Sequence, residues 1–352
     1  MGTEVEPRVR ERITALGLAR TERRADATLR PLTMGLTDWQ RGSAPTEPGP
    51  ASDGAQASLD EPLPRISLGP AEGGALEAAA EASQPDLTLV RTLGEGGMGR
   101  VHLARQRSLD REVAVKGLKR GATSRVAVAL VREARTTGAL EHPGVIPVHA
   151  LGLDERGWPV LVMKRVDGAP WCDLLGDPSH ALWSTRGDDE PLLSNLEILL
   201  RVCETVQFAH SRGVLYLDIK PENVMVGAFG EVYLVDWGIA RRMDEGEDAD
   251  VAGIVGTPAY MAPEMVIGSE LSPRTDVYLL GATLHQVLTG RARHHGTDLQ
   301  SVLLAAAVSD RVGYSADVPA PLADLCNRAT ARDPEGRPAD AGAFRQEVLR
   351  FI

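Results

Sequence analysis

The sequence predicts an α+β protein in two lobes, a small one built mainly from strands and a larger one built mainly from helices. Residues 87–117 alternate apolar and polar positions around a Gly-rich interruption, which is typical of consecutive antiparallel strands. Residues 125–140 then have a helical pattern, and residues 145–166 return to strand-like runs. After residue 190 the helical period dominates, and the expected helices cover 191–212, 274–290, 299–308, 319–331 and 339–351. Strands first and helices afterwards favour this arrangement over an alternating α/β fold.

The composition of the chain changes near residue 86. Residues 42–86 are rich in Gly, Ala, Ser, Pro and acidic residues, contain no aromatic residue, and have Arg65 as their only basic residue. Such a stretch buries too little apolar surface to offset the entropy lost on ordering, so we interpret it as a flexible low-complexity linker. Residues 1–41 have a weak helical pattern and are interpreted as a partly helical N-terminal extension, with docking on the main domain or on a partner as the alternative.

Charge and hydropathy exclude several classes of protein. With 38 Lys and Arg against 49 Asp and Glu, the net charge is −11, and no basic block marks a nucleic-acid binder. No apolar run approaches the about 18–20 residues that cross a bilayer, so no membrane span is expected in this chain. The N-terminus lacks the apolar core of a secretory signal, and the three cysteines are widely separated. We therefore expect a cytoplasmic protein.

The first motif with chemical meaning is a glycine-rich turn, because residues 94–99 read Gly-Glu-Gly-Gly-Met-Gly. Glycines let a backbone turn lie close over phosphates, since no Cβ intrudes. Dinucleotide-binding folds share this spacing, but there the turn opens a helix and an acidic residue follows. In this sequence a strand follows the turn instead, and the basic residue Lys116 stands where those folds would have the acidic residue. A lone lysine is usually a solvated charge. A phosphate loop before Lys116 and Glu133 after it would instead give the ammonium two anionic partners.

A second cluster lies in residues 216–223 and is followed by Asp236-Trp237-Gly238. Asp218, Lys220 and Asn223 have spacings of 0, +2 and +5. One carboxylate can orient a hydroxyl and accept its proton, and a cation can neutralise a migrating phosphoryl group. An amide oxygen and a second carboxylate can hold Mg²⁺. Any one of these residues would be ordinary in a polar turn, so the hypothesis depends on their joint spacing.

A third motif covers residues 256–264, which read Gly-Thr-Pro-Ala-Tyr-Met-Ala-Pro-Glu. If Glu264 is buried it needs a cationic partner, and Arg337 is the candidate. Asp276, just inside an expected helix, is placed to accept backbone N–H bonds from the 216–223 loop. The alternative for each of these charged residues is exposure to solvent.

Taken together, residues 87–352 resemble a eukaryotic-type (Hanks-type) serine/threonine protein kinase, and in particular its bacterial members. The resemblance implies a bilobal protein-kinase fold. Its N-lobe, residues 87–163, would hold five antiparallel strands and one helix, and its C-lobe, residues 167–352, would be mostly helical. ATP would lie in the cleft between the lobes with Mg²⁺ as cofactor, and the γ-phosphate would pass to Ser or Thr hydroxyls of protein substrates.

The resemblance also implies a role for each motif residue. Asp218 would be the catalytic aspartate, Lys220 would contact the γ-phosphate, and Thr257 would link the substrate-docking segment to Asp218. Lys116, paired with Glu133, would hold the α- and β-phosphates. The catalytic set is Asp218, Lys220, Lys116, Glu133 and Thr257, and the Mg²⁺ ligands are Asn223 and Asp236. The nucleotide contacts are Leu93, Gly94, Glu95, Gly96, Gly97, Met98, Gly99, Val101, Ala114, Lys116, Met163, Lys164, Val166 and Met225.

Three residues depart from the family pattern. Tyr216 stands where the family usually has His, and its ring is expected to pack under Trp237, which replaces the usual Phe. Leu217 replaces the Arg that often precedes the catalytic Asp and pairs with a phosphorylated activation loop. Without that Arg, this form of control loses its main cation.

The activation segment, between Asp236 and Glu264, also lacks the usual features of control by phosphorylation. Between Asp236 and Glu264 the only Ser or Thr is Thr257, and the region where a phosphorylated residue usually lies is acidic. Its acidic residues are Asp244, Glu245, Glu247, Asp248 and Asp250. Our hypothesis is that activity does not require phosphorylation of this loop, and the alternative is a solvated acidic loop with no regulatory meaning.

Two other functions compete with protein phosphorylation. One is a pseudokinase, an ATP-binding scaffold without transfer activity, although the full catalytic set is present. The other is a kinase-like small-molecule phosphotransferase, a group that usually lacks the segment found at 256–264. The linker also offers hydroxyls for autophosphorylation on accessibility alone, at Ser43, Thr46, Ser52, Ser58, Ser67 and Ser83.

Overall fold

The computed structural model describes residues 7, 63–69, 85–96, 99–186, 190–244 and 254–352. The chain divides into two compact units. The strand unit comprises the described residues of 63–141 together with 146–166, and the helical unit comprises 142–145 and the described residues of 167–352. The extension expected at 1–41, apart from residue 7, lies outside the described residues, as does most of the linker expected at 42–86.

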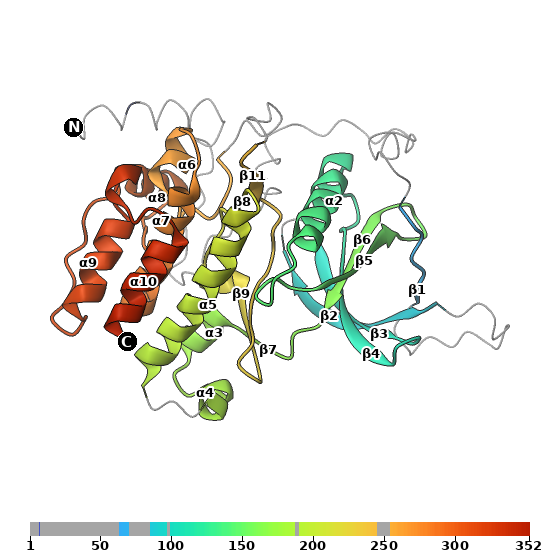
Figure 1. The fold of residues 1–352 in the computed structure, drawn as a ribbon. Coiled ribbons are helices and arrows are strands. Elements are labelled where there is room, and N and C mark those ends of the chain that lie inside the picture. Colours follow the sequence, from blue (N-terminus) through green and yellow to red (C-terminus); the bar gives the residue numbers. More distant parts are fainter. Residues whose placement is uncertain (1–6, 8–62, 70–84, 97–98, 187–189, 245–253) are drawn as a thin grey trace. The chain divides into compact units, whose positions relative to one another are not determined.

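The strand unit holds one sheet and one helix (Figure 1). Its strands are β1 (Leu68–Gly69), β2 (Leu87–Glu95), β3 (Arg100–Gln106), β4 (Arg111–Gly117), β5 (Val148–Leu153) and β6 (Pro159–Lys164). Their order is β1-β2-β3-β4-β6-β5, and every neighbouring pair is antiparallel except β1 and β2. The helix, α2, spans Ser124–Ala139. The expected antiparallel sheet with one helix is confirmed, and β1 is an addition from within the range expected to be linker.

Alternation along the strands gives this sheet two different faces. Val113 and Val115 of β4 belong to one buried apolar cluster, and we call their side of the sheet the valine face. Leu161 of β6 packs with Leu130 of α2 in a second cluster, on what we call the helix face. Successive residues of a strand point to opposite faces, and Lys116 is paired directly with Leu161. Lys116 therefore points to the helix face.

The helical unit contains most of the helices that the structure describes (Figure 1). Its α-helices are α3 (Trp171–Gly176), α4 (Ala181–Arg186), α5 (Pro191–Ser211), α6 (Pro263–Ile267), α7 (Pro273–Thr289), α8 (Leu299–Val308), α9 (Ala320–Ala329) and α10 (Ala341–Phe351). Two 3₁₀ turns lie at Pro221–Asn223 and Pro334–Gly336. Short strands form a sheet of order β10-β9-β7, from β7 (Gly168–Pro170), β9 (Val224–Gly227) and β10 (Val232–Leu234). A second pair joins β8 (Val214–Leu215) to β11 (Arg241–Arg242).

Helix α7 is the centre of this unit. Ser272 and Thr275 form a capping box that fixes its start, with Pro273 at the first helical position. Gly290 ends the helix at φ 70°, a left-handed conformation that glycine adopts without strain. The residues between are buried on nearly every side, and α7 contacts α5, α9 and α10. A helix covered in this way holds the groups at its N-terminus in fixed positions.

Among the described residues, none of the helices combines the length and the apolar character that crossing a bilayer demands.

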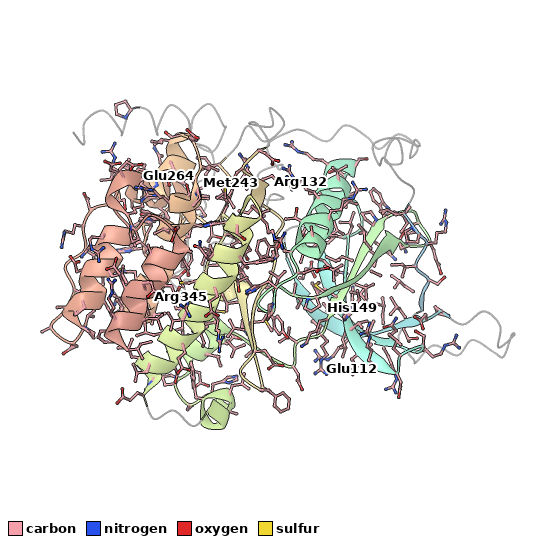
Figure 2. The ribbon with its side chains drawn as sticks, in the orientation of Figure 1. Glu112, Arg132, His149, Met243, Glu264 and Arg345 are labelled. Carbon is pink, nitrogen blue, oxygen red and sulfur yellow. The ribbon has the colours of Figure 1, made fainter. Side chains whose placement is uncertain are left out.

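A buried ion pair joins two parts of the helical unit that are distant in sequence. Glu264 lies near the start of α6 (Figure 2), and its carboxylate accepts bonds of 2.6 and 2.9 Å from the two terminal nitrogens of Arg337. Each residue is only 4% exposed. Arg337 also donates to the carbonyls of Ala331, Arg332 and Arg274, so its remaining donors are satisfied. The expected partner of Glu264 is confirmed.

This pair generates a stability prediction. Glu264→Gln keeps the side-chain shape but leaves the buried Arg337 without its counter-charge, so we expect the free energy of unfolding to fall by about 3–5 kcal/mol. The matched control is Glu347→Gln, because Glu347 pairs with Arg328 at the surface, where loss of an ion pair costs about 0–1 kcal/mol. Urea unfolding of both variants measures the difference. Equal losses would contradict the structural role of the Glu264–Arg337 pair.

Candidate active site

In the strand unit, Lys116 and Glu133 form a buried ion pair. The Lys116 Nζ donates bonds of 2.6 and 2.8 Å to the two carboxylate oxygens of Glu133, and the residues are 8% and 4% exposed. The strand register directs Lys116 to the helix face, and Glu133 belongs to the buried stripe of α2 with Leu130 and Thr137. The pairing expected from the sequence is confirmed. The two bonds to Glu133 fix the position of the Lys116 ammonium.

The strand register brings several of the expected nucleotide contacts to the same side of the sheet. Val101 of β3 lies directly opposite Lys116, and Ala114 of β4 lies opposite Met163 of β6. Ala114 and Lys116 are two residues apart, so all four residues share the helix face. The Lys164 N–H already donates to the Pro147 carbonyl at 2.9 Å, and a hydrogen bond from the Lys164 backbone to a ligand would therefore use its carbonyl oxygen.

The glycine-rich turn between β2 and β3 is closed by its own backbone, since the Gly96 N–H donates to the Gly99 carbonyl at 3.0 Å. A Cβ on Gly99 would collide with the Gly117 carbonyl, so packing requires that glycine. A Cβ on Gly94 or Gly96 would meet no other atom of the described protein within 4 Å. Packing within the described protein therefore does not explain these two glycines. The close approach of a ligand would explain them. Gly97 and Met98 lie outside the described residues.

Two cations hold the Glu95 side chain of this turn. Lys119 Nζ lies 3.0 Å from one carboxylate oxygen, and the Arg100 Nε donates to the other at 2.9 Å. The bonds from Lys119 and Arg100 lower the pKa of Glu95. All of these groups are exposed, so the contribution to stability is small. The pairing links the turn to the residues that follow β4, and sequence reasoning assigned no role to Lys119.

In the helical unit, the buried carboxylate of Asp276 at the start of α7 holds the 216–223 loop. It accepts bonds of 2.8 Å from the backbone N–H groups of Tyr216 and Leu217, as expected from the sequence. The His210 Nε2 also lies 2.8 Å from Asp276 Oδ2. Leu217 has φ 69°, a left-handed conformation that is rare for leucine and persists only when the surroundings enforce it. Asp276 supplies that constraint. The contact of His210 with Asp276 was not predicted, because the two residues are 66 positions apart and no local pattern in the sequence links them.

Three side chains surround the carboxylate of Asp218. Lys220 Nζ and Asn223 Nδ2 each lie 2.8 Å from its Oδ2, and the Thr257 hydroxyl donates to its Oδ1 at 2.7 Å. Lys220 also donates to the Thr257 hydroxyl. The structure therefore brings together the four residues that the sequence placed at this centre. The side chain of Asp218 is 15% exposed, so these partners do not enclose it completely.

Asp236 is held between two fixed neighbours. The Tyr216 hydroxyl donates to the Val235 carbonyl, and the Trp237 Nε1 donates to the Leu234 carbonyl at 3.2 Å. The rings of Tyr216 and Trp237 meet edge to face with centroids 4.7 Å apart, so their expected packing is confirmed. Burial raises the pKa of Tyr216, which keeps its phenol a neutral donor. Asp236 itself has φ 61° and an exposed side chain.

Asn223 and Asp236 provide a fitting donor set for Mg²⁺. Both offer hard oxygen atoms, and the Asn223 amide nitrogen donates to Asp218, so the amide oxygen is the atom that could bind a metal. Mg²⁺ typically binds one or two protein ligands and completes its shell with water and substrate phosphates. Within the described ranges, no group of three or more His, Cys, Asp or Glu side chains could hold a metal. Met225, another residue expected to contact the nucleotide, lies on β9 of this unit.

Comparison with known proteins agrees with this geometry. The family model of the protein kinase domain matches residues 87–349. The serine/threonine-protein kinase PknD of Chlamydia caviae is 32% identical over 288 residues, which cover 75% of this chain and 31% of that protein. The serine/threonine-protein kinase PknB of Mycobacterium tuberculosis is 34% identical over 268 residues, covering 73% of this chain and 41% of that protein.

The chain thus spans about a third to two fifths of the length of these curated relatives. The matched region contains every motif residue described above in both units. On these grounds the chain belongs to the protein kinase family, among the Hanks-type serine/threonine kinases of bacteria.

Proposed function

We propose that this protein uses ATP and Mg²⁺ to phosphorylate Ser and Thr hydroxyls of protein substrates, and that it acts in the cytoplasm, where ATP is available. The observation that carries the proposal is the Asp218 carboxylate, which Lys220, Asn223 and Thr257 hold from three sides. A carboxylate that is fixed and partly accessible suits the orientation of a substrate hydroxyl. A neighbouring ammonium suits the negative charge of a phosphoryl group.

The residues of this chain contribute mainly positioning and charge. Phosphoryl transfer passes through a loose transition state in which the enzyme does little covalent chemistry. Asp218 orients the attacking hydroxyl and accepts its proton, while Lys220 offsets the charge on the transferred group. Lys116, held by Glu133, binds the α- and β-phosphates. Bound Mg²⁺, held by the side chains of Asn223 and Asp236, would supply further neutralisation of phosphate charge.

The 256–264 segment supports a protein rather than a small molecule as substrate. Thr257 bonds to Asp218, the Ala259 carbonyl accepts the His294 N–H at 2.9 Å, and the Tyr260 hydroxyl donates to Gln286. At its end, Glu264 pairs with Arg337. A segment anchored at four points beside the reacting carboxylate offers a fixed surface for an extended peptide. A small-molecule phosphotransferase has no use for such a surface.

The pseudokinase alternative is disfavoured because the catalytic residues are not only present but paired. Lys116 is bonded to Glu133, and Asp218 is bonded to Lys220 and Asn223. Asp236 lies between two neighbours, Val235 and Trp237, that are anchored by hydrogen bonds. An ATP-binding scaffold needs none of these contacts around Asp218, since that carboxylate serves the transfer step.

Two features support activity without phosphorylation of the activation loop. Leu217, which replaces the usual Arg, is an apolar side chain only 3% exposed, so this position offers a phosphate no cation. The start of the segment is held by backbone bonds instead: β11 pairs with β8, and the Met243 N–H donates to the Gly213 carbonyl at 2.7 Å. Arg242 bonds within the segment to Asp244. The other acidic residues of the loop lie outside the described residues.

The central prediction concerns the catalytic carboxylate. Asp218→Ala should lower kcat by about 10²–10⁴-fold, because general-base and positioning contributions have that size, while ATP binding survives. Lys116→Met should also cripple turnover. Phosphate transfer from γ-labelled ATP to a generic basic protein measures the rate, and calorimetric titration measures ATP affinity. Asp317→Ala, an exposed aspartate in the same unit, is the control and should behave as wild type. Wild-type activity from purified Asp218→Ala would refute the proposed function.

A second prediction concerns regulation. Enzyme treated with a phosphatase and then freed of it should retain its full transfer rate, because the apolar side chain of Leu217 offers a loop phosphate no cation at this position. Mass spectrometry before and after treatment establishes that phosphate was removed. Loss of activity on dephosphorylation, with recovery when the loop is phosphorylated again, would overturn the hypothesis of loop-independent activity.

A further inference from the structure

A short segment ahead of the kinase-domain match is packed onto the strand unit. Residues 63–69, which we call the strap, contain β1 at their end. Leu68 pairs with Leu87 of β2. Arg65 forms a parallel bridge with Leu153 of β5, and the backbone bonds there run from Ile66 N to Leu153 O and from Leu153 N to Pro64 O, both at 2.8 Å.

The strap therefore bonds to both edges of the sheet that the other five strands form. In the order β2-β3-β4-β6-β5, the edge strands are β2 and β5, and the strap contacts each of them. Figure 1 shows this segment, coloured blue, passing from the β5 end of the sheet to β2. An unpaired edge exposes a row of backbone donors and acceptors, and the strap covers part of both rows.

Side chains of the strap alternate as those of a strand do. Ile66 and Leu68 pack against the valine face, whereas Arg65 and Ser67 are exposed. The buried cluster beneath the strap comprises Leu87, Ala104, Val113, Val115, Val160 and Val162. Without the strap, part of this apolar surface would face water.

The sheet is shaped to receive the strap at Gly152. A Cβ on Gly152 would lie 2.5 Å from the Pro64 carbonyl oxygen and 2.6 Å from Cγ1 of Ile66, closer than real Cβ atoms approach other atoms. The φ of Gly152 is not in the left-handed region, so backbone conformation does not require glycine there. The close approach of the strap is the reason that remains.

We propose that the strap is an intramolecular docking element that stabilises the nucleotide-binding face of the strand unit. The strands that it covers on the valine face carry Val101, Ala114, Lys116 and Met163 on the other. Strand residues alternate between faces, so loosening Val113 and Val115 also loosens the placement of Ala114 and Lys116. Docking of the strap favours ATP binding, and its release weakens it. This second part rests on the proposed function, whereas the docking itself does not.

The position of the strap makes it a point of control. In the sequence, residues 70–86 lie between the strap and β2, and closing a connection of that length costs entropy that opposes docking. Anything that binds residues 1–62 and draws on the strap would shift the docked population, and with it the affinity for ATP. Ser67 is the only one of the expected autophosphorylation sites among the described residues, and its exposed side chain makes no contact that docking needs.

Two variants of the full chain test the docking from opposite sides. Ile66→Glu puts a charge against the valine face, and Gly152→Ala fills the space that the strap occupies without altering the strap. Their controls are Ser67→Glu, the exposed neighbour of Ile66, and Gly138→Ala, at a helical glycine of the same unit where a Cβ would find ordinary contact distances of 3.9 Å or more. The readouts are residue-resolved hydrogen exchange, thermal unfolding and ATP titration.

The amide of Leu153 is the most direct reporter, because it donates its hydrogen to the Pro64 carbonyl of the strap. In Ile66→Glu and Gly152→Ala this amide should exchange about tenfold faster or more. The Tm of the unit should fall by about 2–8 °C, and ATP should bind several-fold more weakly. The Lys164 amide, bonded to Pro147, should stay protected, and both controls should match wild type. The double variant should lose little more than the worse single variant, since both remove the same contact.

Each outcome decides a separate part of the proposal. Fast exchange of the Leu153 amide in the wild-type chain, or Gly152→Ala behaving like Gly138→Ala, would show that the strap is not docked. Faster exchange without a change in ATP affinity would refute the coupling and leave the docking intact. If the wild-type chain binds no ATP at all, the proposed function fails, while the exchange and Tm comparisons still decide whether the strap docks.

Discussion

The helical unit depends on one buried carboxylate, that of Asp276, at the N-terminus of α7. This side chain is fully buried and accepts three hydrogen bonds, two from the backbone of the 216–223 loop and one from His210. The loop needs this support because Leu217 occupies a left-handed conformation. The position of Asp218, the next residue, follows from that conformation. Lys220, Asn223 and Thr257 can then converge on its carboxylate.

A comparable constraint operates in the strand unit, because successive side chains of β4 point to opposite faces of the sheet and make different contacts there. Val113 and Val115 build the apolar cluster on one face, and Lys116 meets Glu133 on the other. A slip of one residue in the strand register would exchange these sets, so the apolar packing also fixes the position of the ammonium. The strap adds to the same packing from outside the matched kinase domain. In this sheet, the packing that stabilises the strands therefore also sets the position of Lys116.

Much of this arrangement is predictable from the sequence, and the exceptions share a physical cause. The ion pairs Lys116–Glu133 and Glu264–Arg337 were predictable because a charge expected to be buried needs a partner, and the motifs supplied the candidates. The bond from Asp276 to the loop was predictable in the same way. His210 and Lys119 were not, since each meets its partner only through the tertiary fold. The strap was missed because two apolar residues in a low-complexity stretch give no strand signal until both sheet edges exist.

The most direct test of this account is the single-turnover rate of phosphate transfer by Asp276→Asn, measured with saturating ATP and compared with wild type. An asparagine turns an amide group toward one of the two backbone N–H donors, which removes one bond and adds a repulsion. The account predicts that the transfer rate falls by about 10- to 100-fold, because a hydrogen bond to a charged group of this kind is worth about 1.5–3 kcal/mol. ATP affinity should not change, since Asp276 acts only through the loop. A wild-type transfer rate in Asp276→Asn would contradict the account.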